Sequence, residues 1–306
     1  MIVSASYRTD IPAFYGRWFA RRLAAGWCAA VNPYSGKPYR IALRPPEVAG
    51  MVFWTRHVTP FLPVLDKVAE AGLPFVVQHT LTGYPRALEA AVAEPEKALA
   101  GMREVAHRFG PRALVWRHDP IVLSSLTPPA WQRAAFAATA RRLEGVVDEV
   151  VVSFLQVYRK TVRNMAAAAR AGGFTWDDPG PAGKQALLAE LAPLAARHGI
   201  RLTLCGQPEL LVPGVAEARC IDPARLQDLA GRPVPAAAQP HRACACAASR
   251  DIGAYDTCPE GCAYCYAVVR RAVARRHHAA HDADSPFLFA PPGTPVPEAP
   301  DQGRFL

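Results

Sequence analysis

Short apolar segments alternate with longer amphipathic segments along most of the chain. Six runs rich in branched residues predict strands at residues 2–5, 51–54, 74–79, 113–116, 149–153 and 201–205. Between them, apolar residues spaced three and four positions apart predict helices at residues 63–71, 94–109, 129–143, 158–171 and 184–198. Such alternation favours parallel strands joined by right-handed crossovers, in a barrel or a doubly wound sheet.

We predict an α/β fold in which the six strands form a partial (β/α)6 barrel of the TIM type. The predicted barrel domain spans residues 1–240, a cysteine-rich segment packed on it spans residues 241–283, and a Pro/Ala-rich tail spans residues 284–306. The composition of the tail predicts poor order. Residues 28–43 interrupt the alternation with an Asn-Pro-Tyr-Ser-Gly-Lys run, which predicts an inserted hairpin or loop.

Polar residues follow each predicted strand at its C-terminal end. In a parallel barrel these ends lie on one face, where active sites are built. Arg8, Arg56 and Arg117 each follow an apolar strand, and a guanidinium is a donor that suits a bound carboxylate or phosphate better than a helix cap. Strand-to-helix turns are polar in any fold, so helix capping is the alternative role for single Thr, Ser and Asp residues. The residues predicted to line the pocket are Arg8, Asp10, Thr55, Arg56, Gln78, Thr80, Thr82, Arg117, Asp119, Ser153 and Glu209.

Composition narrows the class of protein. The chain has 306 residues, of which 51% are hydrophobic and 20% charged, so it can bury a large core and is neither a disulfide-stapled miniprotein nor disordered throughout. Lys and Arg outnumber Asp and Glu by 35 to 26, and the net charge of +9 is compatible with an anionic ligand. There is no leader with a long apolar core and no run of about 18 apolar residues, which predicts a cytoplasmic protein without a membrane partner.

Five of the eight cysteines lie close together near the C-terminus, at positions 244, 246, 258, 262 and 265. In a reducing compartment, such cysteines more often bind metal or react than form disulfides. Cys258, Cys262 and Cys265 form a Cys-x3-Cys-x2-Cys array, and three such thiolates suit an iron–sulfur cluster, zinc or cuprous ion. A zinc ribbon would more usually have two separate Cys-x2-Cys pairs, whereas the other pair here is Cys-x-Cys, at Cys244 and Cys246. The array therefore favours an iron–sulfur cluster, with zinc and chance clustering as alternatives.

The array, with Tyr264 directly before its third cysteine, resembles the signature of radical S-adenosylmethionine enzymes. The resemblance implies that Cys258, Cys262 and Cys265 hold a [4Fe–4S] cluster whose fourth iron binds S-adenosyl-L-methionine. It also implies an enzyme that cleaves S-adenosylmethionine reductively to act on an unknown, anionic or other small substrate, with an electron donor such as a flavodoxin or ferredoxin. Residues 241–283 would then be the iron–sulfur-binding segment.

Two features depart from the radical pattern. Radical enzymes normally place the cysteine loop after the first strand, whereas here it follows all six predicted strands; a circularly permuted order could still bring it to the mouth of the barrel. No Gly-Gly-Glu-like stretch is present for the amino group of S-adenosylmethionine, and Glu209 and Asp119 are candidates for that role.

The Cys-x-Cys pair leaves two arrangements open. A fourth thiolate from Cys244 or Cys246 would close the cluster to S-adenosylmethionine. Alternatively, the two could share an auxiliary centre with Cys28, Cys205 or Cys220, and the spacing selects no set.

Four stretches together resemble the bacterial family of domain of unknown function 1848, whose reaction is unassigned. These are residues 53–56, 80–85 and 116–121, and the cysteine-rich residues 244–267. Two other classes of protein stay open: an α/β barrel enzyme with a structural metal site, and a basic nucleic-acid-binding protein with a structural iron–sulfur or zinc site. The basic residues are spread over strand ends and helices without interleaved aromatics, which disfavours nucleic acid.

Overall fold

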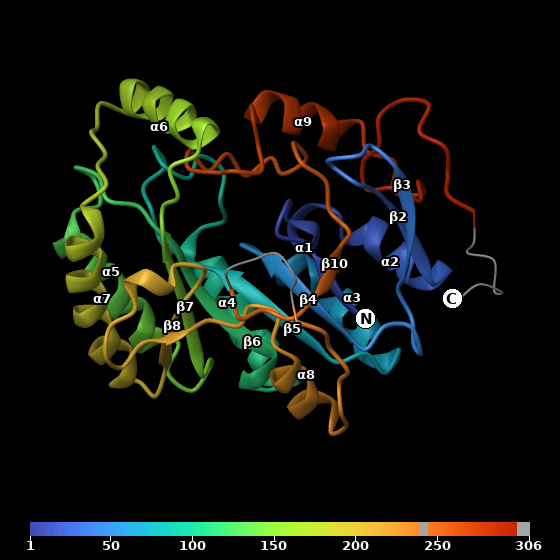
Figure 1. The fold of residues 1–306 in the computed structure, drawn as a ribbon, viewed down its shortest axis with the longest axis horizontal. Coiled ribbons are helices and arrows are strands. Elements are labelled where there is room, and N and C mark those ends of the chain that lie inside the picture. The colour runs from blue at the N-terminus through green and yellow to red at the C-terminus, as the bar shows by residue number, and fades with distance from the viewer. Residues whose placement is uncertain (239–243, 299–306) are drawn as a thin grey trace.

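One parallel sheet of eight strands forms the centre of the molecule (Figure 1). The computed structural model describes residues 1–238 and 244–298. The strand order is β10-β1-β4-β5-β6-β7-β8-β9, and every neighbouring pair is parallel. The strands are β1 (Ile2–Ala5), β4 (Gly50–Thr55), β5 (Phe75–Thr80), β6 (Leu114–Ile121), β7 (Glu149–Phe154), β8 (Arg201–Leu204), β9 (Ala216–Glu217) and β10 (Ser249–Asp251).

The six predicted strands are β1 and β4 to β8, and they are consecutive neighbours in the sheet, which confirms the α/β class. The strands β9 and β10 were not predicted, because two and three residues are too few to show a pattern. Within the described residues no ladder joins β9 to β10. The sheet therefore has eight strands, not the six of the predicted partial barrel, and the described residues form no closed barrel.

The five predicted helices correspond to α3 to α7, with small differences at their ends. Helices α1, α2, α8 and α9 complete the described set. Their bounds are α1 (Ile11–Phe14), α2 (Gly16–Ala25), α3 (Leu62–Glu70), α4 (Pro95–Phe109), α5 (Pro129–Arg142), α6 (Arg159–Gly172), α7 (Gly180–Ala196), α8 (Pro223–Ala230) and α9 (Arg271–Ala279). Among the described residues, no helix combines the length and the apolar character needed to cross a membrane.

Alternate residues of the strands bury opposite faces of the sheet, as expected for a parallel sheet covered on both sides. Phe53 and Trp116 belong to the larger core cluster, which also contains the apolar side chains of α2, α3, α4, α5 and α7. Val52 and Val115 belong to a smaller cluster with Leu226 of α8. The second face thus forms a smaller interior, which also receives the segments around residues 218–221 and 246–247.

The chain returns to the first strand near its C-terminus. Strand β10 pairs with β1, with Ile2 opposite Ser249 and Ser4 opposite Asp251. The loop that carries Cys258, Cys262 and Cys265, called the cysteine loop below, follows β10. Because the two strands are parallel, this loop begins at the carboxyl edge of the sheet. Helices α6 and α9, which follow β7 and the cysteine loop, lie at the top in Figure 1, and α8 lies at the bottom.

The insertion after α2 is a hairpin, which confirms the prediction for residues 28–43. Strands β2 (Trp27–Val31) and β3 (Pro38–Ala42) are antiparallel. The Ala29 N–H donates to the carbonyl of Pro286 (2.9 Å), and Phe287 and Leu288 are buried.

The predicted tail therefore does not begin as a poorly ordered segment at residue 284. Its first residues carry two apolar side chains that pack on the fold. Residues 299–306 and the predicted domain boundary between residues 240 and 241 lie outside the described residues.

Candidate functional site

The three cysteines of the array share one cavity. A hollow of about 280 Å³ is lined by Cys258, Cys262 and Cys265 together with Glu260, and by Asn164 of α6. Burial raises the pKa of the Cys258 thiol well above its ordinary value, and the nearby Asp10, Cys265, Glu260 and Cys262 raise it further. The thiols are thus close enough to influence one another, and without a bound metal their neutral form is favoured.

The segment after β5 holds the cysteine loop in place. The Ala91 N–H donates to the Glu260 carbonyl (2.9 Å), and the Ala263 N–H donates to the Leu88 carbonyl (2.8 Å). The hydroxyl of Tyr15, the residue directly after α1, donates to the Thr257 carbonyl (2.6 Å). Leu88 and Ala91 follow β5, and Tyr15 follows β1. These bonds therefore fix the loop over the carboxyl ends of β5 and β1.

Gly261 makes the loop conformation possible. Its φ is +79°, in the left-handed region, and a Cβ at this position would lie 2.5 Å from Nε of Arg271. A side chain would therefore be strained and would collide with Arg271, whose Nε donates to the Pro259 carbonyl (3.2 Å).

Arg56, which follows β4, is a buried cation beside this loop. Its backbone N–H donates to Oδ2 of Asp10 (2.7 Å), and its Nη2 donates to the hydroxyl of Tyr264 (2.6 Å). Its Nη1 donates to Oε1 of Glu89 (2.8 Å). Burial opposes the positive charge, but Cys262 and Glu89 outweigh burial and hold the pKa of Arg56 well above its ordinary value. The site therefore contains a permanent cation beside the cysteines.

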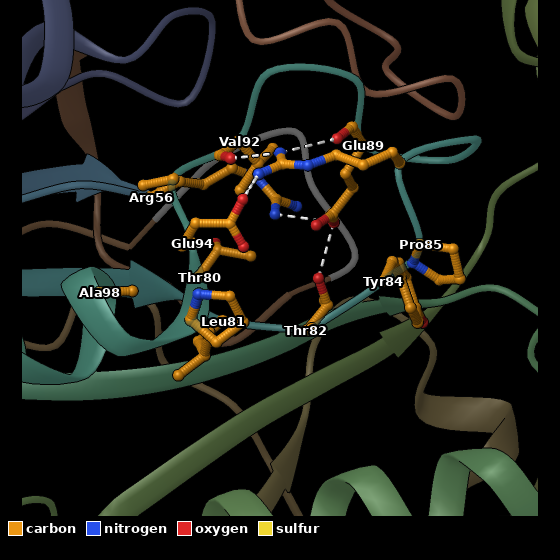
Figure 2. A pocket seen from close by; sticks show the side chains of 14 residues that line it. Arg56, Thr80, Leu81, Thr82, Tyr84, Pro85, Glu89, Val92, Glu94 and Ala98 are labelled. Carbon is orange, nitrogen blue, oxygen red and sulfur yellow. Dashed lines mark hydrogen bonds and ion pairs between the residues drawn. The ribbon is translucent and has the colours of Figure 1, made fainter.

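Glu89 connects the cysteine loop with a second cavity. Arg56, Glu89, Thr80 and Thr82 line a hollow of about 190 Å³, and the Thr82 hydroxyl donates to Oε1 of Glu89 (2.6 Å) (Figure 2). Glu89 also forms a β-bridge with Cys262. Two predicted residues, Thr80 and Thr82, are thus near Arg56, whereas Glu89 was not predicted.

Two carboxyl groups of the site are buried. Burial raises the pKa of Asp10 to about 6, against the hydrogen bonds that Asp10 accepts from Arg56 and Ala13. Burial, followed by the nearby Asp10, raises the pKa of Glu260 to about 8. Glu260 is 3% exposed, and its Oε2 has no hydrogen-bond partner within the described residues. Glu260 therefore presents a buried acceptor in the cavity of the three cysteines.

Arg117 organises a second group of predicted residues. Its Nη1 donates to Oε1 of Gln78 (3.2 Å) and its Nε to Oδ2 of Asp119 (3.1 Å). The Ser153 hydroxyl donates to the other oxygen of Asp119. The guanidinium also lies over the ring of Trp54, 4.9 Å from its centroid. The structure thus brings together Gln78, Arg117, Asp119 and Ser153 from β5, β6 and β7.

Arg8 lies near the end of β1. Its Nε is 3.9 Å from Oδ1 of Asp251, and its guanidinium lies 5.3 Å from the ring of Tyr255. Lys160 approaches the same ring to 5.5 Å. All three predicted arginines therefore face a carboxylate of the protein: Asp251 for Arg8, Glu89 for Arg56 and Asp119 for Arg117. Binding of an external anion by them stays a prediction.

The remaining predicted residues are placed differently. The Thr55 hydroxyl accepts the His57 N–H (2.9 Å), which is a capping contact beside Asp10. Glu209 is exposed in the 3-10 helix η3 (Pro208–Leu210), where its backbone carbonyl accepts from Gln185. The site also contains three acidic residues that were not predicted from the sequence, Glu89, Asp251 and Glu260.

The donor set of the array consists of three thiols, which suit an iron–sulfur cluster or a zinc ion. As they stand, no three His, Cys, Asp or Glu side chains among residues 1–238 and 244–298 could hold a metal ion. A tetrahedral ion with bonds of roughly 2.3 Å would draw thiolates to about 3.8 Å from one another. A cubane is wider, and its thiolates are soft ligands whose negative charge Arg56 would offset. Three thiols on the wall of one cavity match that chemistry.

Comparison with known proteins gives a family and no reaction. The sequence model of a family described as Domain of unknown function (DUF1848) matches residues 2–267. The matched residues include every strand of the central sheet and all three cysteines of the array. No curated protein and no solved structure matches the chain.

Proposed function

The chain belongs to the DUF1848 family, and we propose that it is an iron–sulfur enzyme of the radical S-adenosylmethionine type. Cys258, Cys262 and Cys265 would hold a [4Fe–4S] cluster and leave one iron for S-adenosyl-L-methionine. When bound, the cluster supplies the electron that cleaves the sulfonium of S-adenosylmethionine. The proposal includes a small or anionic substrate, a cytoplasmic setting that keeps the thiols reduced, and an electron donor such as a flavodoxin or ferredoxin.

The observation that carries the proposal is the place of the cysteine loop in the sheet. The loop follows β10, and β10 lies at the edge of the sheet beside β1. In space, therefore, the loop follows the first strand of the series β10-β1-β4-β5-β6-β7-β8, although it comes last in the chain. This supports the permuted arrangement, because the loop lies at the carboxyl edge, where α/β enzymes build their active sites.

The loop is connected to the polar strand ends. The Tyr266 hydroxyl, one residue after Cys265, donates to the carbonyl of Tyr7 at the end of β1. Burial raises the pKa of Tyr266, and the nearby Cys265, Asp251, Tyr255 and Asp119 add to the effect. Tyr266 is thus near both the cysteine loop and the Arg117 group. We assign that group, with Asp119 and Ser153, to the substrate side of the pocket.

Glu260 is the best candidate for the amino group of S-adenosylmethionine. Its Oε2 is buried without a partner among the described residues, and Glu260 lines the cavity of the three cysteines, where an ammonium would be a strong donor. The two candidates from sequence fit less well. Glu209 is exposed, and Asp119 is already paired with Arg117 and Ser153.

Anaerobic purification followed by metal and sulfide analysis tests the proposal. We expect roughly four irons and four sulfides per chain for one cubane, and 5′-deoxyadenosine after addition of dithionite and S-adenosylmethionine. Ala at Cys258, Cys262 or Cys265 should remove both signals. Cys28→Ala is the matched control, because Cys28 is buried in β2 outside the cavity. Stoichiometric zinc on the three cysteines without sulfide would exclude the proposal.

A further inference from the structure

Three cysteines outside the array meet beside the smaller core cluster. Cys205 directly follows β8, Cys220 follows β9, and Cys246 precedes β10. The Sγ atoms of Cys220 and Cys205 are 3.4 Å apart, and a side-chain hydrogen bond joins Cys220 to Cys246. Cys244 is close enough to influence Cys246 electrostatically. Three thiols from three separate segments therefore gather at one place, and Cys244 lies two residues from Cys246 in the chain.

The thiols lie between the two edge strands of the open sheet, β9 and β10, and we call this region the seam. The segment after β9 and the segment before β10 belong to the two edge strands, which no ladder joins within the described residues. The Ala247 N–H donates to the Ile221 carbonyl (3.0 Å), and the Ala245 N–H donates to Oε1 of Glu217 (3.0 Å). The thiols thus stand where the two edges come together through loops.

A buried cation faces the thiols. Arg117 is 5% exposed, and its Nη1 donates to Sγ of Cys220 (3.0 Å). A neutral thiol is a weak acceptor for a guanidinium, whereas a metal-bound thiolate carries negative charge and is a strong one. The guanidinium is therefore placed to stabilise a thiolate at Cys220 once a metal ion displaces its proton.

We propose that Cys205, Cys220, Cys244 and Cys246 bind one zinc ion that closes the seam between the two edges of the sheet. Four thiolates make a closed, structural zinc site, and the tetrahedral S–S distance of about 3.8 Å is close to the 3.4 Å contact of Cys205 and Cys220. A cubane would spread its thiolates over separate irons and needs a wider spacing.

Binding requires a change in the thiols, which as they stand form no metal site within the described part of the chain. Each of the four loses its S–H proton to solvent and turns its sulfur toward a common centre, so that one Zn²⁺ and four thiols give a tetrathiolate of charge 2− and four released protons. Arg117 offsets part of that charge. Cys28 is excluded from the set, because it is buried in the larger core with β2.

The test measures zinc in a protein that lacks the array. In a C258A/C262A/C265A variant we expect about one zinc per chain by elemental analysis, and a tetrahedral thiolate spectrum after exchange for Co²⁺. A C205S/C220S variant should bind no zinc and yet keep the iron and sulfide of the array. Cys28→Ala is the control that should change neither metal.

Three results would overturn the zinc site. The first is a C258A/C262A/C265A variant (the loop variant) that is folded but contains no metal. The second is iron and sulfide in this variant in place of zinc. The third is a Cys205–Cys220 disulfide found by mass spectrometry of alkylated protein. If a variant does not fold, native mass spectrometry of the anaerobically purified, unaltered protein decides, because one zinc in addition to an intact cluster on the array adds a distinct mass. Failure of the radical proposal would leave the zinc count in the loop variant unchanged, so the two outcomes are distinguishable.

Discussion

Arg56 and Glu89 form a buried ion pair beside the cysteine loop, with 2.8 Å between Nη1 and Oε1. The side chains are 11% and 4% exposed. Arg56 also reaches Tyr264 and Asp10, and Glu89 also accepts from Thr82. The pair therefore ties the ends of β4 and β5 to the loop that carries the cysteines.

Removing one partner of this pair should be costly. Glu89→Ala leaves the Arg56 charge buried without its carboxylate, and we expect the free energy of unfolding to fall by about 3–5 kcal/mol. Urea denaturation measures the effect. The matched control is Glu94→Ala, because Glu94 pairs with Arg86 at the exposed surface; it should cost less than about 1 kcal/mol. Equal losses in the two variants would contradict the role given to burial.

Acid should destabilise the protein through His79. His79 is fully buried in β5, neither ring nitrogen has a hydrogen-bond partner among the described residues, and burial lowers its pKa to about 3. An unfolded histidine has a pKa of about 6.5, so the unfolded state binds the proton more readily. The stability that neutral His79 contributes is therefore present above pH 6.5 and is lost as the pH falls toward 3.

The size of that loss can be measured by urea denaturation at several pH values. Between pH 6.5 and pH 4.5 the His79 contribution should amount to about 2–3 kcal/mol. His79→Leu should flatten the pH dependence over this window. His107→Gln changes an exposed histidine on α4 and should leave the profile as it is. An unchanged profile in His79→Leu would refute the assignment.

Gly261 should be required for the cysteine loop. Gly261→Ala combines a φ of +79° with a Cβ 2.5 Å from Nε of Arg271, so the loop has to move and iron incorporation should fall. Gly36→Ala is the matched control, since Gly36 has a φ of +69° in the β2-β3 hairpin and a Cβ added there would meet no atom within 4 Å. It should lose only about 1–2 kcal/mol of stability through backbone strain. Iron content per folded chain separates the two; full iron in Gly261→Ala would contradict the prediction.

The strands of the fold were predictable where their signal is local. Strands β1 and β4 to β8 are apolar runs buried on both faces, and their polar ends follow directly in the sequence. Strands β9 and β10 could not be found, because two and three residues are too few to show a pattern and only the pairing with β8 and β1 defines them. The position of β10 decides where the cysteine loop lies, so the sequence left the permuted arrangement open.

The site shows the same division. The spacing of Cys258, Cys262 and Cys265 is local and predicted one site, and the three residues do share one cavity. Cys205 and Cys220 are 15 residues apart, and only the tertiary fold brings them together. Glu209 and Glu260 are equivalent as letters, and burial, which the sequence does not report for a single acid, distinguishes them.

Glu260 should determine the affinity for S-adenosylmethionine. Its buried Oε2 lacks a partner among the described residues, and a hydrogen bond to the ammonium of the ligand would contribute about 1.5–3 kcal/mol, the range for charged groups. With a pKa of about 8, Glu260 ionises when the ammonium binds, whereas Glu260→Gln keeps the shape but cannot ionise, so affinity should fall by roughly 10- to 150-fold. Calorimetric titration of the reconstituted protein measures it, and the absorption of the cluster should not change. Glu209→Gln, at the exposed 3-10 helix, should bind normally. The opposite result, weakened binding in Glu209→Gln with normal binding in Glu260→Gln, would place the amino group at the other end of the sheet, near β8.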